Sequence, residues 1–116
     1  MPTLDTVRRF ALALPEATEG TSYGTPAFKV RGKLFARLRD GDDGGGEVLV
    51  VKADFGDQEA LLQLQPEVYF LTPHYVGYPC VLVRLARIEE EELRERLIAA
   101  WRYCAPKRLA ASFAQP

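Results

Sequence analysis

Residues 16–85 form short apolar runs separated by glycine and proline, and segments with helical spacing lie before and after this stretch. Short apolar runs bounded by turn residues are typical of strands joined by turns. We therefore predict an α+β protein built on an antiparallel β-sheet. The expected strands are residues 26–30, 34–39, 47–52, 68–71 and 80–85, and the expected helices are residues 4–14, 54–64, 88–104 and 106–113. Residues 48–51 are continuously apolar, so the strand at residues 47–52 is expected to be central and covered on both faces. In the helix at residues 54–64, Ala60, Leu61 and Leu64 are expected to point inward.

Helical spacing is clearest at the two ends of the chain. The N-terminal set is Leu4, Val7, Ala11 and Leu14, with Thr3 as the expected N-cap, and the C-terminal set is Leu93, Leu97, Trp101 and Cys104. Each set falls on one side of a helix, so both helices are expected to bury that side. Residues 89–92 are glutamates at the start of the second helix, where the helix dipole favours anions. Four consecutive glutamates are poor geometry for one cation, and no metal site is predicted.

Composition limits the class of protein to which the chain belongs. Its 116 residues have the usual size of one domain, so residues 1–116 are expected to form a single domain. The net charge of −1 does not favour tight nonspecific binding of nucleic acid, which usually rests on a positive excess. The start of the chain lacks the pattern of a signal peptide, and no membrane span is visible, so a cytoplasmic protein without a membrane partner is expected.

The chain contains no complete catalytic motif, so we expect a noncatalytic protein without a cofactor. Cys80 and Cys104 have no metal-binding spacing and are expected to be buried free thiols. The sequence supports no prediction of oligomeric state.

The turn between the first two expected strands sets their register. A two-residue turn would place Val30 opposite Lys33 and mix charged and apolar side chains on one face. A three-residue loop, with its glycine at positive φ, places Val30 opposite Leu34 and Phe28 opposite Ala36. We predict the three-residue loop because it gives one apolar face. The opposite face would then carry Lys29, Phe35, Arg37 and Arg39.

Residues 20–39 contain five basic residues and no acidic one. Two interpretations of this stretch remain open. The functional one is a surface that contacts phosphates, with an aromatic ring that packs on a sugar or base. The structural one is a solvated outer face whose charges guard a sheet edge against aggregation. The candidate nucleic-acid-binding residues are Lys29, Arg31, Lys33, Phe35, Arg37 and Arg39.

Residues 72–79, Thr-Pro-His-Tyr-Val-Gly-Tyr-Pro, contain the single histidine of the chain and two tyrosines between two prolines. In one interpretation His74, Tyr75 and Tyr78, together with Tyr23, present rings and donors to a small molecule or a partner protein. In the other, the prolines rigidify a turn whose rings fold back over the core. A catalytic role for His74 is not predicted, because no Ser, Cys or Asp has a spacing that completes a triad.

Several segments, taken in order, resemble the MmcQ/YjbR family of small bacterial proteins. They are residues 14–17 (Leu-Pro-Glu-Ala), 23–28 (Tyr-Gly-Thr-Pro-Ala-Phe), 32–36 (Gly-Lys-Leu-Phe-Ala), 72–79 and 105–109 (Ala-Pro-Lys-Arg-Leu). The resemblance implies a frataxin-like (CyaY-like) fold, in which an antiparallel sheet has the N-terminal and C-terminal helices packed on one face. It also implies two β-hairpin wings, proposed in that family to contact DNA, which here correspond to residues 26–39 and 68–85.

The leading hypothesis from the sequence is therefore a DNA-binding protein whose binding is weak and salt-dependent. Lys107 and Arg108, at the start of the last expected helix, join the basic candidates as an anion site. Ion pairing of these two residues with carboxylates such as those at residues 89–92 is the other interpretation. The alternative function is a binding module for a small molecule or a protein partner, centred on the loop at residues 72–79.

Overall fold

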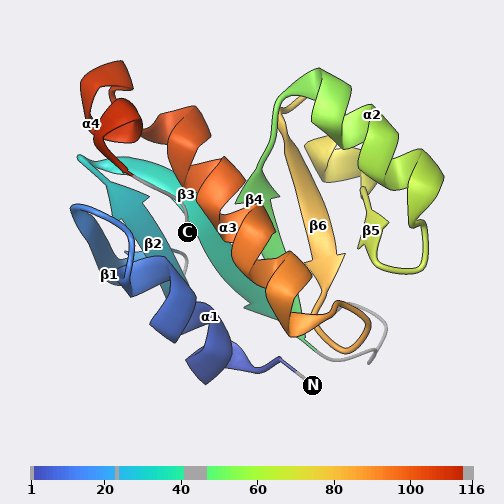
Figure 1. Ribbon diagram of the computed structural model, residues 1–116. Coiled ribbons are helices and arrows are strands. Elements are labelled where there is room, and N and C mark those ends of the chain that lie inside the picture. The colour runs from blue at the N-terminus through green and yellow to red at the C-terminus, as the bar shows by residue number, and fades with distance from the viewer. Residues whose placement is uncertain (1, 23, 41–46, 114–116) are drawn as a thin grey trace.

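The fold is a six-stranded sheet with helices packed on one side of it (Figure 1). A computed structural model describes residues 2–22, 24–40 and 47–113. The helices are α1 (Leu4–Leu12), α2 (Phe55–Leu64), α3 (Glu90–Cys104) and α4 (Lys107–Ser112), and η1 (Pro73–Tyr75) is a 3₁₀ turn. The strands are β1 (Ala17–Ser22), β2 (Thr25–Val30), β3 (Lys33–Asp40), β4 (Glu47–Lys52), β5 (Tyr69–Phe70) and β6 (Cys80–Arg84).

The strands pair in the order β1-β2-β3-β4-β6-β5, and all neighbours are antiparallel. The predicted α+β class, with the N-terminal and C-terminal helices on one face, is confirmed. The central position predicted for β4 is also confirmed, since it lies between β3 and β6. β1 has no counterpart among the predicted strands, because most of its residues are exposed and it carries no apolar alternation.

A capping box starts α1, as the position of Thr3 predicts. The Thr3 side chain accepts from the Thr6 backbone N–H (3.4 Å), and the Thr6 hydroxyl accepts from the Thr3 backbone N–H (3.1 Å). Val7 and Ala11 are fully buried on the inner side of the helix. A bidentate ion pair between Arg8 and Glu19 (2.6 and 2.8 Å) fastens the helix to β1, and this hydrogen bonding lowers the pKa of the Glu19 carboxyl.

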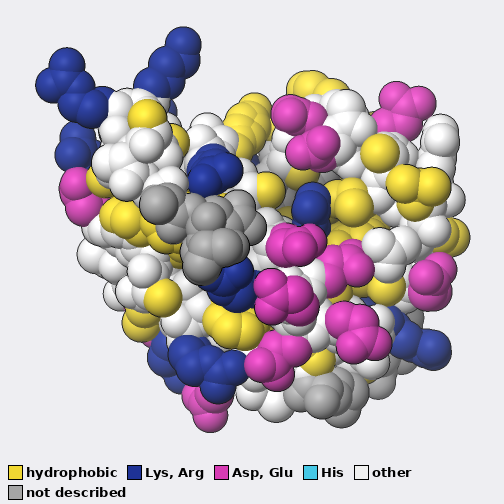
Figure 2. Space-filling view, in the orientation of Figure 1, with side chains coloured by type: hydrophobic (Ala, Val, Ile, Leu, Met, Phe, Trp, Pro, Cys, Tyr) yellow, Lys and Arg dark blue, Asp and Glu magenta, His cyan; other side chains and the backbone are white. Residues whose placement is uncertain are grey.

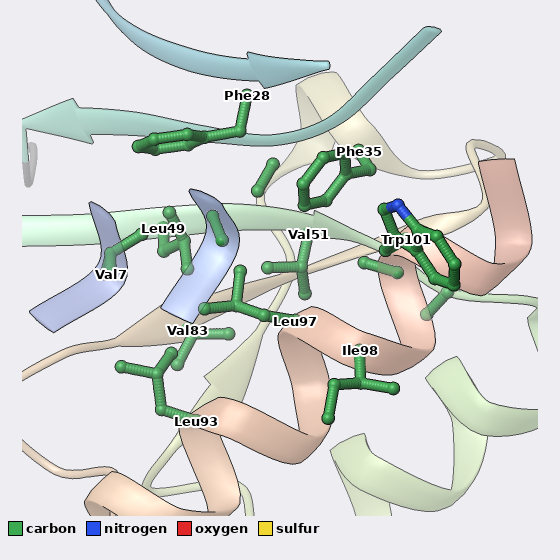
Figure 3. Close-up of a cluster of buried hydrophobic side chains, with 14 of the residues drawn as sticks. Val7, Phe28, Phe35, Leu49, Val51, Val83, Leu93, Leu97, Ile98 and Trp101 are labelled. Atoms are coloured by element: carbon green, nitrogen blue, oxygen red, sulfur yellow. The ribbon is translucent and has the colours of Figure 1, made fainter. Parts of the chain in front are cut away.

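The core lies between the sheet and the helices α1 and α3. Figure 3 shows side chains from the sheet, from α1 and from α3 pointing toward one another, including Val7, Phe28, Leu49, Leu97 and Trp101. The Trp101 indole N–H donates to the backbone carbonyl of Pro15 at 2.9 Å. This bond ties α3 to the end of the N-terminal helical segment, so the largest buried side chain also joins the two helices that cover the sheet.

The position predicted for the inserted helix α2 is confirmed, but the predicted orientation of its side chains is not. Leu61 and Leu62 pack against the core, whereas Ala60 is exposed and Leu64 is 77% exposed. The prediction that Ala60 and Leu64 point inward is wrong. At 100° per residue, the face centred between Leu61 and Leu62 leaves Leu64 about 110° and Ala60 about 150° away from its middle, so these two side chains point outward.

The turn between β2 and β3 also differs from the prediction. Val30 pairs with Lys33 rather than with Leu34, so the connection has two residues. Arg31 has φ 49° and Gly32 has φ 82°, the positive values that a type I′ hairpin turn requires. The charged side chain of Lys33 is tolerated opposite Val30 because it lies at the exposed end of the strand.

A β-bulge restores the register farther from the turn. Phe28 pairs with Ala36 as predicted, while the neighbouring pair is Lys29 with Leu34, so Phe35 is the extra residue. Phe35 and Ala36 both belong to the buried core. The prediction that Phe35 lies on the outer face is wrong, because the two-residue turn and the bulge together place its ring on the helix side.

Three of the four glutamates at residues 89–92 have separate partners. Glu90 pairs with Arg9 (3.0 Å), Glu91 lies 3.7 Å from Arg94, and Glu92 accepts hydrogen bonds from Tyr69 and Gln65. Figure 2 shows acidic side chains gathered over α3. Across residues 2–22, 24–40 and 47–113, no group of acidic, histidine or cysteine side chains is suited to hold a metal ion.

Both cysteines are buried free thiols, which confirms the prediction. Among the helices in the described part of the chain, none is long and apolar enough to cross a lipid bilayer.

Replacing Trp101 by phenylalanine should lower the free energy of unfolding by about 2–4 kcal/mol, because it leaves a cavity and an unpaired Pro15 carbonyl. Urea-induced unfolding measures the change. Tyr103→Phe on the same helix is the control, since Tyr103 is 46% exposed. A loss at position 101 no larger than that at position 103 would contradict this role of the indole.

Candidate functional site

The sheet has a second face, turned away from α1 and α3, that we name the open face. Side chains alternate between the two faces of a strand, and those of Val30, Val51 and Val83 point into the core. The side chains between the core residues therefore point the other way. On β2, β3, β4 and β6 the open face carries Lys29, Arg37, Arg39, Val50, Lys52, Leu82 and Arg84.

The loop at residues 72–79 folds over the open face. The Tyr75 hydroxyl accepts a hydrogen bond from Nη2 of Arg37 at 2.6 Å, and the guanidinium of Arg39 lies 5.9 Å from the centre of the Tyr75 ring. Both arginines belong to β3, which is separated from β6 by β4. The Tyr75 side chain therefore meets these arginines over β4.

Internal hydrogen bonds fix the shape of this loop. The Tyr75 N–H donates to the Thr72 carbonyl (2.9 Å), and the Tyr78 N–H donates to the Tyr75 carbonyl (3.1 Å). From α2, the Gln58 amide donates to the backbone carbonyls of Tyr78 (2.9 Å) and Cys80 (2.6 Å). The loop is thus held by Arg37 at Tyr75 and by Gln58 at its C-terminal end, so the Tyr75 ring is oriented before any ligand arrives.

Between the loop and the sheet lies a hollow of about 350 Å³. Its polar and aromatic lining comes from Arg37, Lys52, His74, Tyr75 and Tyr78, and its apolar lining includes Leu34 and Val50. The rings of His74 and Tyr75 meet edge to face at 4.9 Å, and Tyr78 is 57% exposed. None of the described lining residues is acidic, so the hollow combines aromatic rings with positive charge.

The structure brings three of the six hairpin candidates together on the open face. Lys29, Arg37 and Arg39 share this face, although Arg37 and Arg39 are already engaged with Tyr75. Arg31 lies in the turn and makes a bidentate ion pair with Glu16 (2.8 and 3.0 Å). The hydrogen bonds of Arg31 lower the pKa of the Glu16 carboxyl, so this cation is neutralised by a neighbour.

The remaining candidates lie elsewhere. The Phe35 ring is fully buried and cannot pack on a base, so its predicted role is wrong. Lys33 is exposed beside the turn, on the side of the sheet that Val30 faces. Tyr23 lies outside the residues that the structure describes.

Lys107 and Arg108 do not extend the open face. They start α4, which packs on the helix side of the sheet through Leu109 and Phe113, with the Phe113 ring 5.4 Å from that of Trp101. The prediction that they form one surface with the hairpin is wrong, because α4 continues the helical layer. The ion pairs recorded between described residues include neither Lys107 nor Arg108, and three of the four glutamates at residues 89–92 bind other partners.

Neither predicted wing stands free of the sheet. The first, β2 and β3, lies between β1 and β4. The second contains the pairing of Tyr69 and Phe70 with β6, but its long loop folds back instead of projecting. The rings at its tip therefore face the sheet surface and the hollow.

Lys52 and Arg84 are open-face residues that the sequence analysis missed. Each ends a strand whose preceding residues are continuously apolar, so alternation is hidden in the sequence. Counting along the strand would have found them, because side chains two residues apart point to the same face of a sheet. Lys52 is two residues from Val50, and Arg84 is two residues from Leu82. Arg84 also lies over the ring of Phe70, 4.1 Å from its centre.

Comparison with known proteins identifies the relatives of this chain. The sequence profile of the YjbR family matches residues 12–103. The uncharacterized proteins Mb2600 of Mycobacterium bovis and Rv2570 of Mycobacterium tuberculosis are each 38% identical to this chain over 127 aligned residues, covering 97% of this chain and 96% of the relative. The crystal structure of Deinococcus radiodurans protein DR2400, assigned to the domain family DUF419, superposes with a TM-score of 0.75 at 25% identity. That superposition covers 89% of this chain and 78% of the Deinococcus chain.

Tyr75→Phe should loosen the loop, because Arg37 loses its hydroxyl acceptor. We expect a fall of about 1 kcal/mol in the free energy of unfolding and faster hydrogen exchange at the Tyr75 and Tyr78 amides. Tyr78→Phe is the matched control, since its hydroxyl has no hydrogen bond recorded among the described residues. Equal exchange rates in the two variants would show that the Arg37 contact does not hold the loop.

Proposed function

Because the chain belongs to the YjbR family and has a ring-lined hollow on its open face, we propose that it binds a small anionic ligand with a flat ring. Mononucleotides are members of this class. The observation that carries the proposal is the hollow of about 350 Å³ between the sheet and the loop at residues 72–79. This volume lies within the usual range of small-molecule sites. We propose binding without a chemical step, in the cytoplasm.

The charge of the hollow favours an anion. Lys52 and Arg37 both line it, and the described lining residues include no carboxylate. Arg37 is bound to Tyr75, so its role is to position the ring and to add positive potential. Lys52 is the residue that we propose to contact the anionic group directly.

The rings favour a flat, unsaturated group in the ligand. Tyr78 and His74 are exposed at the margin of the hollow, where a planar group can stack on them. Stacking of a base on an aromatic side chain contributes about 1–3 kcal/mol. The loop is already fixed by hydrogen bonds to α2 and β3, so little conformational entropy is lost when a ligand binds.

Binding of adenosine 5′-monophosphate, measured by calorimetry, tests the proposal. Lys52→Gln and Tyr78→Ala should each weaken binding about tenfold, which corresponds to about 1.4 kcal/mol. Adenosine and inorganic phosphate, tested separately, should bind more weakly than the nucleotide because each lacks one half of the interaction. Lys107→Gln, on the helix side, is the control and should leave the affinity unchanged. The proposal fails if the nucleotide does not bind, or if the control variant weakens binding as much as Lys52→Gln.

A second candidate function is DNA binding, as the resemblance implied. The observation in its favour is the gathering of Lys29, Arg37, Arg39, Lys52 and Arg84 on one face of adjacent strands. Phe70 and Tyr75 lie among these cations, and a basic surface with aromatic rings suits a single strand.

Fluorescence anisotropy with single-stranded and duplex DNA distinguishes this candidate. If DNA binds the open face, affinity should fall steeply as salt rises from about 50 to 200 mM, and Lys29→Gln should reduce the salt dependence by about one counterion. Lys107→Gln/Arg108→Gln should have no effect, because these residues lie on the other side. If the protein binds the nucleotide but not DNA at about 50 mM salt, DNA binding is ruled out and the small-ligand proposal stands.

A further inference from the structure

A second cavity, of about 540 Å³, lies between α2 and α3, on the opposite side of the sheet from the loop at residues 72–79. Its floor is formed by Val51 of β4 and Val81 of β6, which pair with each other, together with Ala53 and Leu61. Figure 2 shows hydrophobic side chains between the two helices, bordered by side chains of both charges. The floor is thus apolar and the rim is charged.

The two walls of this cavity carry opposite charges. Asp54 and Asp57 come from the start of α2. Arg96 and Arg102 come from α3, where positions six residues apart differ by about 120° around the helix, so the two side chains border the cavity on either side of Ala99. No ion pair between described residues joins the acidic wall to the basic wall, although both line the same space.

Arg96 lines this cavity, and its side chain carries a donor without a partner. Its Nε is buried and has no hydrogen-bond partner among the described residues. Buried polar groups are nearly always paired, and an exception calls for an explanation such as a functional role or a bound water or ion. Arg102 is partly engaged, since its guanidinium lies 5.7 Å from the centre of the Phe113 ring.

The charges select the class of ligand. A simple anion would be attracted by the basic lining residues, Lys52, Arg96 and Arg102, but repelled by the two aspartates. A simple cation would be attracted by the aspartates but repelled by the three basic residues. A small molecule with both charges satisfies both walls at once. We propose that this cavity binds a small zwitterion with an aliphatic part, such as an aliphatic α-amino acid. Its carboxylate lies on Arg96, its ammonium group faces the aspartates, and its aliphatic part covers Val51 and Val81.

This proposal is independent of the open-face site, and its test uses other residues. Lys52 lines both cavities and is therefore not used to distinguish them. The probe is L-leucine, measured by calorimetry and by chemical-shift changes of the full chain. Two analogues, 4-methylpentanoate and 3-methylbutylamine, each retain the aliphatic part and one of the two charges. We expect leucine to bind and each analogue to bind at least about tenfold more weakly.

Arg96→Met removes the charge and keeps most of the side-chain volume. It should weaken leucine binding at least about tenfold, while the thermal unfolding midpoint of the free protein stays the same or rises, because a buried unpaired donor is removed. Arg94→Met is the matched control on the same helix, since Arg94 pairs with Glu91 and does not line the cavity. It should leave leucine affinity unchanged.

Four results would overturn the proposal. One is the absence of leucine binding at about 10 mM, and another is equal binding of 4-methylpentanoate, which would make the site a carboxylate site. The third is a large fall in the unfolding midpoint of Arg96→Met, which would show that Arg96 supports the fold. Asp57→Asn provides a second variant at an exposed position, where loss of folding is not expected. Unchanged leucine affinity in Asp57→Asn and Asp54→Asn would likewise contradict the role of the acidic wall.

Discussion

The bulge in β3 decides which side chains each face of the sheet presents. The two-residue turn places Lys33 on the helix side, so strict alternation would send Arg37 and Arg39 into the core and Leu38 out of it. One extra residue reverses this outcome, because Phe35 and Ala36 both point inward and the arginines beyond them turn to the open face. Burying unpaired guanidinium groups costs several kcal/mol per ion. The insertion of a single residue therefore protects the core and creates the basic surface at the same time.

The open face depends in turn on the loop at residues 72–79. An antiparallel sheet with helices on one side leaves its other side to solvent or to a partner. Here the contact with Arg37 of β3 brings the Tyr75 side chain over β4, and this part of the face becomes a lined hollow. A feature that the sequence suggests as a projecting tip is thus a partial cover. The difference favours a small ligand over a long duplex as the occupant.

Features set by residues close together in the sequence were predictable, whereas contacts between distant segments were not. The buried sides of α1 and α3 follow from apolar spacing, and the place of β4 follows from its continuous apolar run. The turn at Arg31 was mispredicted because a non-glycine residue at positive φ is uncommon, so sequence alone favours a loop in which only the glycine takes that conformation. β1 was missed because residues 17–22 have no apolar alternation and gain their order by pairing with β2.

The same distinction applies to the sites. The aromatic loop was recognisable as a candidate from its composition, but the hydrogen bond between Tyr75 and Arg37 joins residues 38 positions apart. Lys52 was hidden because alternation cannot be seen inside a fully apolar strand. The cavity between α2 and α3 was also beyond prediction, since its charged walls come from two helices and neither has an unusual sequence.

The position of Cys80 has a consequence for how motion at the hollow can be followed. Its thiol lies under the loop, and burial raises its pKa, as it also does for Cys104 near the end of α3. The thiolate is the species that reacts with alkylating reagents, so both cysteines are protected from alkylation while they are buried. Labelling of Cys80 relative to Cys104 therefore reports how often the loop lifts from the sheet. The labelling rate of a native side chain can thus report the opening of this site.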